Sequence, residues 1–552
     1  MYTKVLLLTS LTALLVACST PPIGGPTAPP KAADAGQLTL PSGHRLWVYP
    51  DELMYSGVAR YQWPTGRSYE GEWNIGLPHG IGTELIDSPA GQVRYHGQWH
   101  EGARHGHGEL TAPNGDHYVG SFVRGTRHGE GTETTAKGLY RGYWANGAPH
   151  GLGEFSGSDG AKFRGQWTDG QRDGHGTFID ARGNRYEGEW VNDAPNGFGT
   201  FTSSVGTIYE GSWVDGNRGG YGRLEEPSGL VYEGLWADNK RHGFGKERRP
   251  DNSSFEGEWQ FDKRHGQGIE TQADGGYHDG SWENSVALGP GTRHQPTGVE
   301  ISGAWNGDVV STGLLILPSG AQYAGALFRK RNREADGKLV SWLQGLTDDA
   351  YANYFLGTLY LDYEKPARDE EQASRLLGAA AQAGIAEAQF RLAVLLLDKD
   401  VQQVLELLIA AAEADHGRAN ELLGEYYHLG RFVDRDLTAA HDYYTKAVAS
   451  GSLQARNNLA WLLATAPDAY LRDGNRAVEV IRPIALLYGD WQHLDTLAAA
   501  YAETGEFEAA VEAQRQALAA TTSSAEAPPE ELLQQMQDRL NLYQQQVPFH
   551  EP

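Results

Sequence analysis

Cysteine is almost absent from this chain, since Cys18 is the only one among its 552 residues. A single cysteine has no partner within the chain, so internal disulfides are excluded as a source of stability. One apolar run, residues 5–16, follows Lys4 near the N-terminus. It is too short to cross a bilayer and is typical of the apolar core of a signal peptide, so we expect export.

Positive charge is scarce: 46 lysine and arginine residues stand against 71 aspartate and glutamate residues, which gives a formal net charge of −25. Residues 336–552 contain 33 acidic and 16 basic residues, a charge of −17, and the remaining −8 belongs to residues 1–335. An acidic chain repels phosphate backbones and anionic membrane surfaces, which disfavours nucleic acid and lipid surfaces as partners. The same acidity also serves the solubility of a long, exposed repeat protein.

Motifs for catalysis and cofactor binding are also lacking. None of the glycine-rich stretches carries the Lys-Ser/Thr of a phosphate-binding loop or opens a helix. No Ser-His-Asp arrangement has a recognisable frame. We therefore predict no catalytic residue, no metal site and no cofactor, and we expect the chain not to be an enzyme; an enzyme with an unrecognised site stays as an alternative.

The cysteine itself stands at an informative place, at the end of the letters LVAC. With leucine three positions before Cys18 and alanine directly before it, the segment resembles the lipobox of bacterial lipoproteins. The resemblance implies a signal peptide over residues 1–17, cleavage before Cys18, and several acyl chains, palmitate among them, as a membrane anchor. Ser19, where an aspartate would favour inner-membrane retention, implies the outer membrane. The alternative is an ordinary cleaved signal peptide with an incidental cysteine. Residues 18–44, which are rich in Pro, Ala and Gly, are expected to form a flexible linker.

A short phrase recurs down the first two-thirds of the chain: an aromatic, any residue, Gly, any residue, an aromatic. Its copies begin 22 or 23 residues apart after a first gap of 26, and a fixed period of this kind indicates an array of small identical units. The copies start at Tyr69, Tyr95, Tyr118, Tyr140, Phe163, Tyr186, Tyr209, Tyr232, Phe255, His278, Ile301 and Tyr323.

Each copy has the pattern of a two-stranded hairpin. Side chains alternate along a strand, so in YEGEW the two rings and the glycine share one face and the two glutamates share the other. Asn74-Ile75-Gly76 is a turn signal, and His79-Gly80-Ile81-Gly82 reads as a second strand with two glycines on one face. We expect a ring from a neighbouring strand to lie over the bare glycine backbone, because glycine weakens a strand unless something packs on it.

The repeat resembles the MORN repeat, whose consensus is close to YEGEW-x-NG-x-x-HG-x-G. Twelve copies cover Tyr69 to about Arg333, and a degenerate thirteenth is expected at Tyr55-Ser56-Gly57. The resemblance implies an all-β MORN-type hairpin array over residues 45–335, with atypical terminal units as caps.

The histidines and acids of the repeats are unsuited to chemistry. Equivalent positions in stacked repeats lie ~10 Å apart, two strand spacings, which is too far to share one metal ion. Glu70 and Glu72 recur in several repeats and are expected on the solvated outer face rather than as a catalytic pair. The histidines of the His-Gly copies are expected to pack beside turns; they are His79, His105, His128, His150, His242 and His265.

Near residue 336 glycine gives way to Ala, Leu, Glu and Gln with helical spacing. Five two-helix units follow with a period of about 32 to 38 residues, and they resemble Sel-like repeats, with a last pair nearer the tetratricopeptide form. The resemblance implies an α-solenoid of helix pairs over residues 336–519. Residues 520–552 are expected to add one capping helix and a loose tail, and Trp461 is expected in the core.

These features predict a non-enzymatic, membrane-anchored lipoprotein that faces the periplasm and acts as a protein–protein interaction scaffold. The expected partners are envelope proteins bound by the α-solenoid, with no nucleic acid and with membrane contact through the lipid anchor alone. An alternative is a module that binds cell-wall glycan or lipid with the aromatic face of the array. Exposed ladder tryptophans would favour the glycan alternative, and a buried ladder would favour the scaffold.

Overall fold

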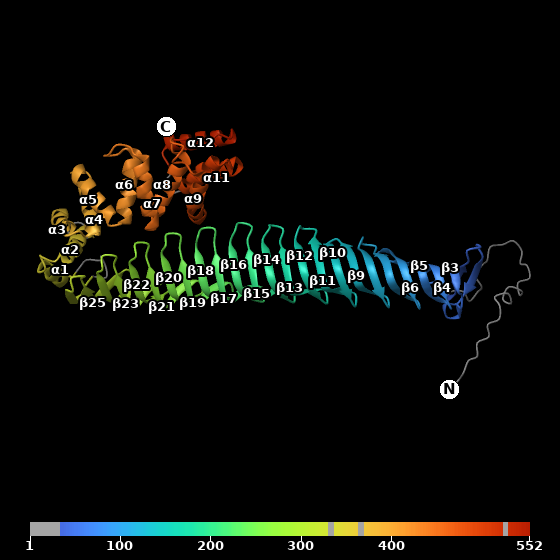
Figure 1. The fold of residues 1–552 in the computed structure, drawn as a ribbon. Coiled ribbons are helices and arrows are strands. Elements are labelled where there is room, and N and C mark those ends of the chain that lie inside the picture. The colour runs from blue at the N-terminus through green and yellow to red at the C-terminus, as the bar shows by residue number, and fades with distance from the viewer. Residues whose placement is uncertain (1–33, 329–335, 363–368, 523–527) are drawn as a thin grey trace, which may run out of the picture. The chain divides into compact units, whose positions relative to one another are not determined.

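The computed structural model describes residues 34–328, 336–362, 369–522 and 528–552 (Figure 1). The chain divides into two compact units, residues 1–181 and 182–552. Cys18, with the predicted signal peptide and most of the predicted linker, lies outside the described residues.

The first unit consists of antiparallel strands joined by short turns. A 3-10 turn at Pro50–Glu52 interrupts them near the start. The strands are β1 (Gly36–Thr39), β2 (Arg45–Val48), β3 (Gly57–Gln62), β4 (Ser68–Asn74), β5 (Leu77–Ser88), β6 (Gly91–His100), β7 (Ala103–Thr111), β8 (His117–Val123), β9 (Thr126–Thr135), β10 (Gly138–Ala145), β11 (Ala148–Gly157), β12 (Lys162–Thr168) and β13 (Gln171–Ile179).

The second unit begins with further strands of the same kind. Each pairs with the next in an antiparallel register, as β14 does with β15. They are β14 (Arg185–Val191), β15 (Ala194–Thr202), β16 (Ile208–Val214), β17 (Asn217–Glu225), β18 (Val231–Ala237), β19 (Lys240–Arg248), β20 (Ser254–Gln260), β21 (Lys263–Thr271), β22 (Tyr277–Glu283), β23 (Val286–His294), β24 (Glu300–Asn306), β25 (Val309–Ile316) and β26 (Gln322–Ala326).

Helices make up the rest of the second unit. Each packs on its neighbour in the sequence, which is the arrangement of a solenoid. They are α1 (Gly337–Gln344), α2 (Ala350–Asp362), α3 (Glu370–Gln382), α4 (Ala386–Leu396), α5 (Val401–Glu413), α6 (Gly417–Leu429), α7 (Leu437–Ala449), α8 (Leu453–Thr465), α9 (Gly474–Tyr488), α10 (Trp491–Thr504), α11 (Phe507–Thr521) and α12 (Glu530–Gln544). The predicted fold class, a β-hairpin array followed by an α-solenoid of helix pairs, is confirmed.

The turns explain why each repeat closes as a tight hairpin. Between β14 and β15 the two central residues, Asn192 and Asp193, have φ of 48° and 67°. Positive φ at both positions gives a turn whose twist matches that of the flanking strands. Asparagine, aspartate and glycine tolerate this geometry best, which is why the repeats carry them there.

The His-Gly-x-Gly strand differs from the prediction, because its two glycines do not share a face. Gly80 has φ of +61° and lies where the register between β4 and β5 shifts: Gly71 pairs with Gly82 but Glu72 pairs with His79, so Gly80 and Ile81 form a bulge. A Cβ on Gly80 would meet the Glu72 carboxylate, whereas a Cβ on Gly82 would meet the Tyr69 ring. The left-handed backbone at Gly80 therefore turns this one position away from the ring face.

The start of the array also differs from the prediction. Strand β1 lies inside residues 18–44, which were predicted as linker, and it pairs with both β2 and β3. Tyr55 precedes β3 instead of opening a thirteenth copy, and Tyr61 of β3 stands opposite Tyr69 of β4. The expected copy at Tyr55 is therefore wrong: β3 supplies the second strand of an incomplete unit.

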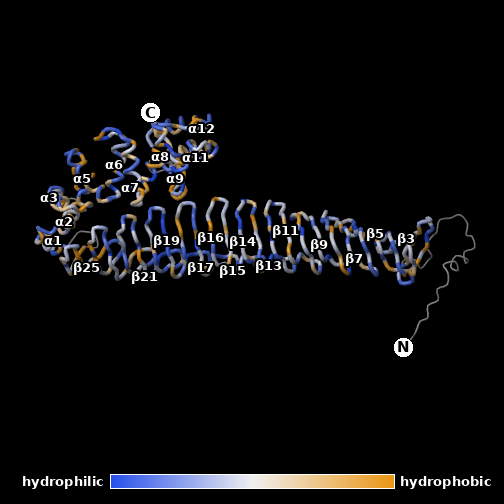
Figure 2. Tube along the Cα trace, in the orientation of Figure 1, coloured by the Kyte–Doolittle hydropathy of each residue, from blue (hydrophilic) through white to orange (hydrophobic). Residues whose placement is uncertain are grey.

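The helices carry clear stop and start signals. Aspartates cap the N-termini of α3, α5, α7, α9 and α10 by accepting from backbone N–H groups. Left-handed glycines end α6, α9 and α10. Apolar and polar residues are interspersed along strands and helices alike (Figure 2). Helix α10 is nevertheless buried all round, from Leu494 to Ala500.

Candidate interaction surfaces

One face of the array is a ladder of packed rings. Tyr209 meets Trp213 of its own strand at 5.2 Å between ring centroids and Trp236 of the next repeat at 5.4 Å, both edge to face. The Tyr209 hydroxyl donates to the Ser212 carbonyl at 3.0 Å, and Trp236 Nε1 donates to the Gly222 carbonyl at 3.1 Å. Burial raises the pKa of Tyr209 to about 12, so the phenol stays a donor. Each ring thus packs its apolar body and satisfies its polar atom.

The predicted packing of rings over glycine is confirmed, with one correction about which strand supplies the ring. Gly188 of β14 and Gly199 of β15 stand opposite each other, and the Tyr186 ring lies over both. For Gly199 the ring comes from the neighbouring strand, as expected. For Gly188 it comes from the same strand, because the Tyr186 hydroxyl reaches along β14 to the Glu189 carbonyl at 3.0 Å.

Arginines cover the ladder. The guanidinium carbon of Arg218 lies 4.3 Å from the Trp236 ring centroid and 5.5 Å from that of Tyr209. Arg241 repeats the arrangement one repeat later, 4.3 Å from Trp259. A cation over a ring face adds electrostatic attraction to apolar cover. Arg218 therefore covers the tyrosine of its own repeat and the tryptophan of the next repeat.

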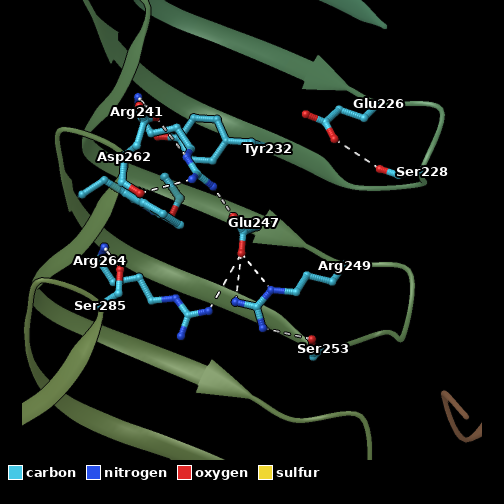
Figure 3. Close-up of polar contacts among 12 residues, drawn as sticks. Glu226, Ser228, Tyr232, Arg241, Glu247, Arg249, Ser253, Asp262, Arg264 and Ser285 are labelled. Carbon is cyan, nitrogen blue, oxygen red and sulfur yellow. Dashed lines mark hydrogen bonds and ion pairs between the residues drawn. The ribbon is translucent and has the colours of Figure 1, made fainter. Parts of the chain in front are cut away.

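Buried carboxylates balance these arginines. Glu247, on β19, forms ion pairs with Arg249 at 2.9 Å, with Arg264 at 4.0 Å and with Arg241, while Arg241 also binds Asp262 (Figure 3). The Glu247 side chain is 7% exposed. A carboxylate this deep needs such partners.

Most tryptophans of the ladder are buried, and their exposure was the criterion that separates a scaffold from a glycan-binding array. Trp63 and Trp167 are half-buried and pack against the same core. The buried ones are Trp73, Trp99, Trp144, Trp190, Trp213, Trp236, Trp259, Trp282 and Trp305. By the criterion set from the sequence, this favours the scaffold.

His278 stands where other repeats have Tyr or Phe, between Trp282 at 5.5 Å and Trp305 at 5.1 Å. Both its ring nitrogens are buried and have no hydrogen-bond partner in the described part of the chain. Burial, with the positive charge of Arg293, lowers its pKa from 6.5 to about 4. Its protonation therefore opposes folding.

We expect His278→Tyr to stabilise the array by about 1 kcal/mol, because the new hydroxyl can reach the Ser281 carbonyl as Tyr209 reaches that of Ser212. In the wild-type chain, unfolded His278 takes up a proton in a pH range where folded His278 stays neutral. The free energy of unfolding should therefore fall as the pH drops from about 6.5 to about 4 and then level off. Urea unfolding followed by tryptophan fluorescence at several pH values measures both effects. His278→Phe is the control: it should remove this part of the pH dependence without adding a hydrogen bond, and an unchanged pH profile in both variants would contradict the assignment.

The opposite face of the array carries exposed aromatics that the sequence analysis missed. Phe198, Tyr221 and Phe244 occupy the same place in three successive repeats and are 58%, 56% and 57% exposed. Equivalent positions two strands apart lie ~10 Å from each other. The signal was present in the sequence, at the variable position between the two glycines of the second strand.

The predicted histidines and acids of the repeats do not converge on a chemical site. In the described ranges no group of three or more His, Cys, Asp or Glu side chains could hold a metal ion. The His79 ring lies 5.3 Å from that of His100 and the His242 ring 5.4 Å from that of Phe261, which are packing contacts. Glu70 and Glu72 are exposed, as expected.

On the solenoid, residues 547–552 are bound rather than loose, which corrects the predicted tail. The chain reverses at Gln546, with φ of 61°, and runs back over the helices. Glu551 Oε1 accepts from Trp461 Nε1 at 2.6 Å, and Glu551 Oε2 accepts from Arg435 Nη2 at 2.8 Å and lies 3.2 Å from His428 Nε2. Trp461 is therefore only partly a core residue, since its indole nitrogen serves this contact.

Among the described residues, no helix combines the length and the apolar character that crossing a bilayer requires.

Solved structures with repeat folds are similar to parts of the chain. A protective antigen of uropathogenic Escherichia coli with an SLR fold is 22% identical, with a TM-score of 0.27, over 33% of this chain and 42% of that one. A Sel1 repeat protein from Oxalobacter formigenes is 20% identical, with a TM-score of 0.28, over 36% and 58%. A TPR-domain containing protein from Parabacteroides distasonis is 12% identical, with a TM-score of 0.24, over 94% and 84%. The match thus spans less than two-thirds of the first two structures.

No curated protein matches the chain. The MORN repeat family model matches nine successive segments: residues 69–86, 95–117, 118–139, 140–162, 163–185, 186–208, 209–231, 232–254 and 255–277. The matched segments contain the hairpins, glycine pairs and rings described above, and the hairpins continue beyond them to β26. Residues 69–277 of this chain are an array of MORN repeats.

Proposed function

We propose that this chain is a non-enzymatic lipoprotein of the bacterial outer membrane that faces the periplasm and acts as a protein–protein interaction scaffold. The repeat-protein fold is consistent with a scaffold. The observation that carries the proposal is the closure of the ladder, since its rings, arginines and buried glutamates satisfy one another and leave side chains of the outer face and of the helices for partners.

The two modules take different roles in this proposal. The solenoid belongs to the segment with a charge of −17, and such a surface attracts basic or mixed-charge segments of envelope proteins. The array separates the lipid anchor from the solenoid along the sequence. Repeat modules of both kinds are typically non-catalytic, and the paired state of Glu247 and its equivalents supports the same role here.

Anchoring rests on Cys18. We expect Cys18→Ala to move the protein from the membrane fraction to the soluble fraction or to leave it as the uncleaved precursor, because the acyl chains contribute ~0.8 kcal/mol per buried methylene. Fractionation followed by mass spectrometry of the N-terminal peptide measures both. Cys18→Ser is a matched control that also lacks the thiol and should behave as Cys18→Ala does. Mature wild-type protein without acyl mass on Cys18 would refute the anchor.

Capture of a protein partner tests the scaffold. In intact envelopes, crosslinking should trap the full chain with another envelope protein, and deletion of residues 336–552 should abolish the product. Raising the salt from ~50 to ~500 mM should weaken capture, because screening reduces attraction between exposed charges. Capture that persists unchanged after the deletion would assign partner binding to the array instead.

A second candidate is binding of cell-wall glycan or lipid by the array. The observation that favours it is the exposed row of Phe198, Tyr221 and Phe244 on the outer face, since the ladder itself is closed. Replacing these three residues by serine should reduce co-sedimentation of the protein with purified cell wall if glycan is the ligand. The same replacement should leave crosslinking of a protein partner to the solenoid unchanged.

A further inference from the structure

The solenoid holds a segment of its own chain in a built binding site. The tail segment, residues 547–552, leaves α12 through the left-handed Gln546 and contacts α6, α8, α10 and α12. Several of these contacts join residues about a hundred positions apart in the sequence, so they are tertiary and not a continuation of the helix. The groove that receives the segment is defined by His428, Arg435, Trp461, Thr465 and Arg539, and we call it the tail groove.

One end of the tail groove is a carboxylate site. Trp461 Nε1 donates to one oxygen of Glu551, and Arg435 Nη2 donates to the other at 2.8 Å with His428 Nε2 beside it. The Glu551 backbone N–H donates to the Thr465 carbonyl at 2.7 Å. Burial alone would raise the pKa of the Glu551 carboxyl, but the hydrogen bonds from His428 and Trp461 and the charge of Arg435 outweigh it and lower the pKa. The site is thus built for an ionised carboxylate.

A short distance along the groove is an aromatic site. Phe549 packs against Trp461 at 6.0 Å between ring centroids, and the Arg539 guanidinium carbon lies 5.2 Å from the Trp461 ring and 5.5 Å from the Phe549 ring. Arg539 is itself held by Asp495, with Nη2 at 2.7 Å from Oδ2. The groove therefore holds an aromatic side chain two positions before a carboxylate.

The tail segment leaves part of this surface unused. A cavity of about 420 Å³ adjoins Glu551 and is lined by five side-chain amides: those of Gln454, Asn457, Asn458, Gln492 and Gln535. Asn457 Oδ1 is buried there without a hydrogen-bond partner in the described part of the chain. Side-chain amides both donate and accept, as a peptide backbone does. A longer peptide than the tail segment can therefore add hydrogen bonds with amides that line this cavity.

We propose that the tail groove is the partner-binding site of the solenoid. Its ligand is an extended protein segment with an aromatic residue two positions before a glutamate or aspartate. The tail segment occupies the groove in cis until such a partner displaces it. This inference deepens the proposed scaffold function and rests on it only for the presence of an external partner. Occupation in cis reduces the apparent affinity for a partner to the intrinsic affinity multiplied by the fraction of chains whose groove is empty.

Binding of a peptide to the purified full-length chain tests the proposal. The probe is a fluorescently labelled peptide of residues 545–552, amidated at its end so that the Glu551 carboxylate is its only one. The disarmed chain carries Phe549→Ala and Glu551→Gln, which empty the groove without altering its walls. We expect fluorescence anisotropy to show binding at least 10-fold tighter to the disarmed chain than to the wild type.

Variants of the groove and of the probe provide the controls. Arg435→Glu in the disarmed chain should weaken binding at least 10-fold, and a probe with Gln in place of its Glu should bind as weakly. Arg375→Glu, an exposed residue on α3 remote in sequence from the groove, should change nothing. Equal peptide binding by the wild-type and disarmed chains would overturn the proposal, and so would peptide binding that Arg435→Glu leaves unchanged. A wild-type dimer that dissociates in the disarmed variant would also overturn it, since the tail would then act between two copies.

Hydrogen exchange on the unlabelled wild-type chain keeps the test decisive if the disarmed chain folds poorly. The Glu551 amide, which donates to Thr465, should exchange at least 100-fold more slowly than that of an unprotected residue, and Arg435→Glu should remove this protection. An unprotected Glu551 amide in the wild type would overturn the proposal. Peptide binding with a failed envelope capture would refute the proposed scaffold role and leave the groove standing, so the two failures are distinguishable.

Discussion

Gly211→Val should destabilise the array by more than about 3 kcal/mol, although valine favours strands. Gly211 of β16 stands opposite Gly222 of β17 under the Tyr209 ring. A Cβ at Gly211 would approach the Tyr221 carbonyl oxygen to 2.7 Å and the Tyr209 hydroxyl to 2.8 Å, as well as the Gly222 backbone. Backbone atoms of a paired strand cannot withdraw cheaply, so the strands must separate or Tyr209 must leave the ladder.

Urea unfolding followed by tryptophan fluorescence measures the change, because the ladder tryptophans lie in the array. Glu210→Val is the matched control: it places the same side chain on the exposed face of the same strand and should change stability by less than about 0.5 kcal/mol. Similar effects from the two variants would mean that no close approach of glycine backbones holds the array together.

Arg539→Met should cost the solenoid about 3–5 kcal/mol at pH 7. Arg539 binds Asp495 through Nη2 and Nε at 2.7 and 3.1 Å, and Gln514 adds a bond to the same carboxylate at 2.6 Å. Both ions of the pair are almost fully buried. Methionine replaces the apolar stem of arginine but leaves the Asp495 charge without its cation, and α12 loses this ion pair with α10.

Two features separate this effect from simple loss of packing. Burial already raises the pKa of Asp495, so without Arg539 the carboxyl should protonate more readily and the cost should shrink as the pH is lowered towards 5. Adding Asp495→Asn to Arg539→Met should restore a large part of the stability, since it removes the unpaired charge. Far-UV circular dichroism during urea unfolding reports on the helices, and a double variant less stable than the single one would contradict the ion-pair account.

The sequence predicted what depends on local period. Rings and glycines two positions apart gave the buried face of β16 correctly, because strand geometry alone decides which side chains share a face. The helical spacing of alanine and leucine after residue 336 likewise predicted the helix pairs. Both inferences needed contacts only within one repeat or between neighbours, which is what a repeat sequence encodes.

Other features could not be predicted from the sequence, because they depend on local exceptions to the repeat or on contacts between distant residues. Gly80 reads as an ordinary strand glycine, and only its φ of +61° reveals the bulge that turns it to the outer face. The contact of His428 with Glu551 joins residues 123 positions apart and follows no period. The exposed Phe198 lies at the variable position between two glycines, where the repeat consensus specifies no residue type, so only a direct comparison of successive repeats reveals the row of rings.

The pairing of each ladder tyrosine with the tryptophans of its own and the next repeat has a consequence for how such chains change in evolution. Because Tyr209 contacts Trp213 and Trp236, gain or loss of one whole unit of about 23 residues restores the same ring contacts at the new junction. Partial insertions would misplace a glycine under a ring and should be rejected. The number of repeats is therefore free to vary between related chains in whole units, each adding ~10 Å of sheet, two strand spacings, without altering any residue that makes the ladder.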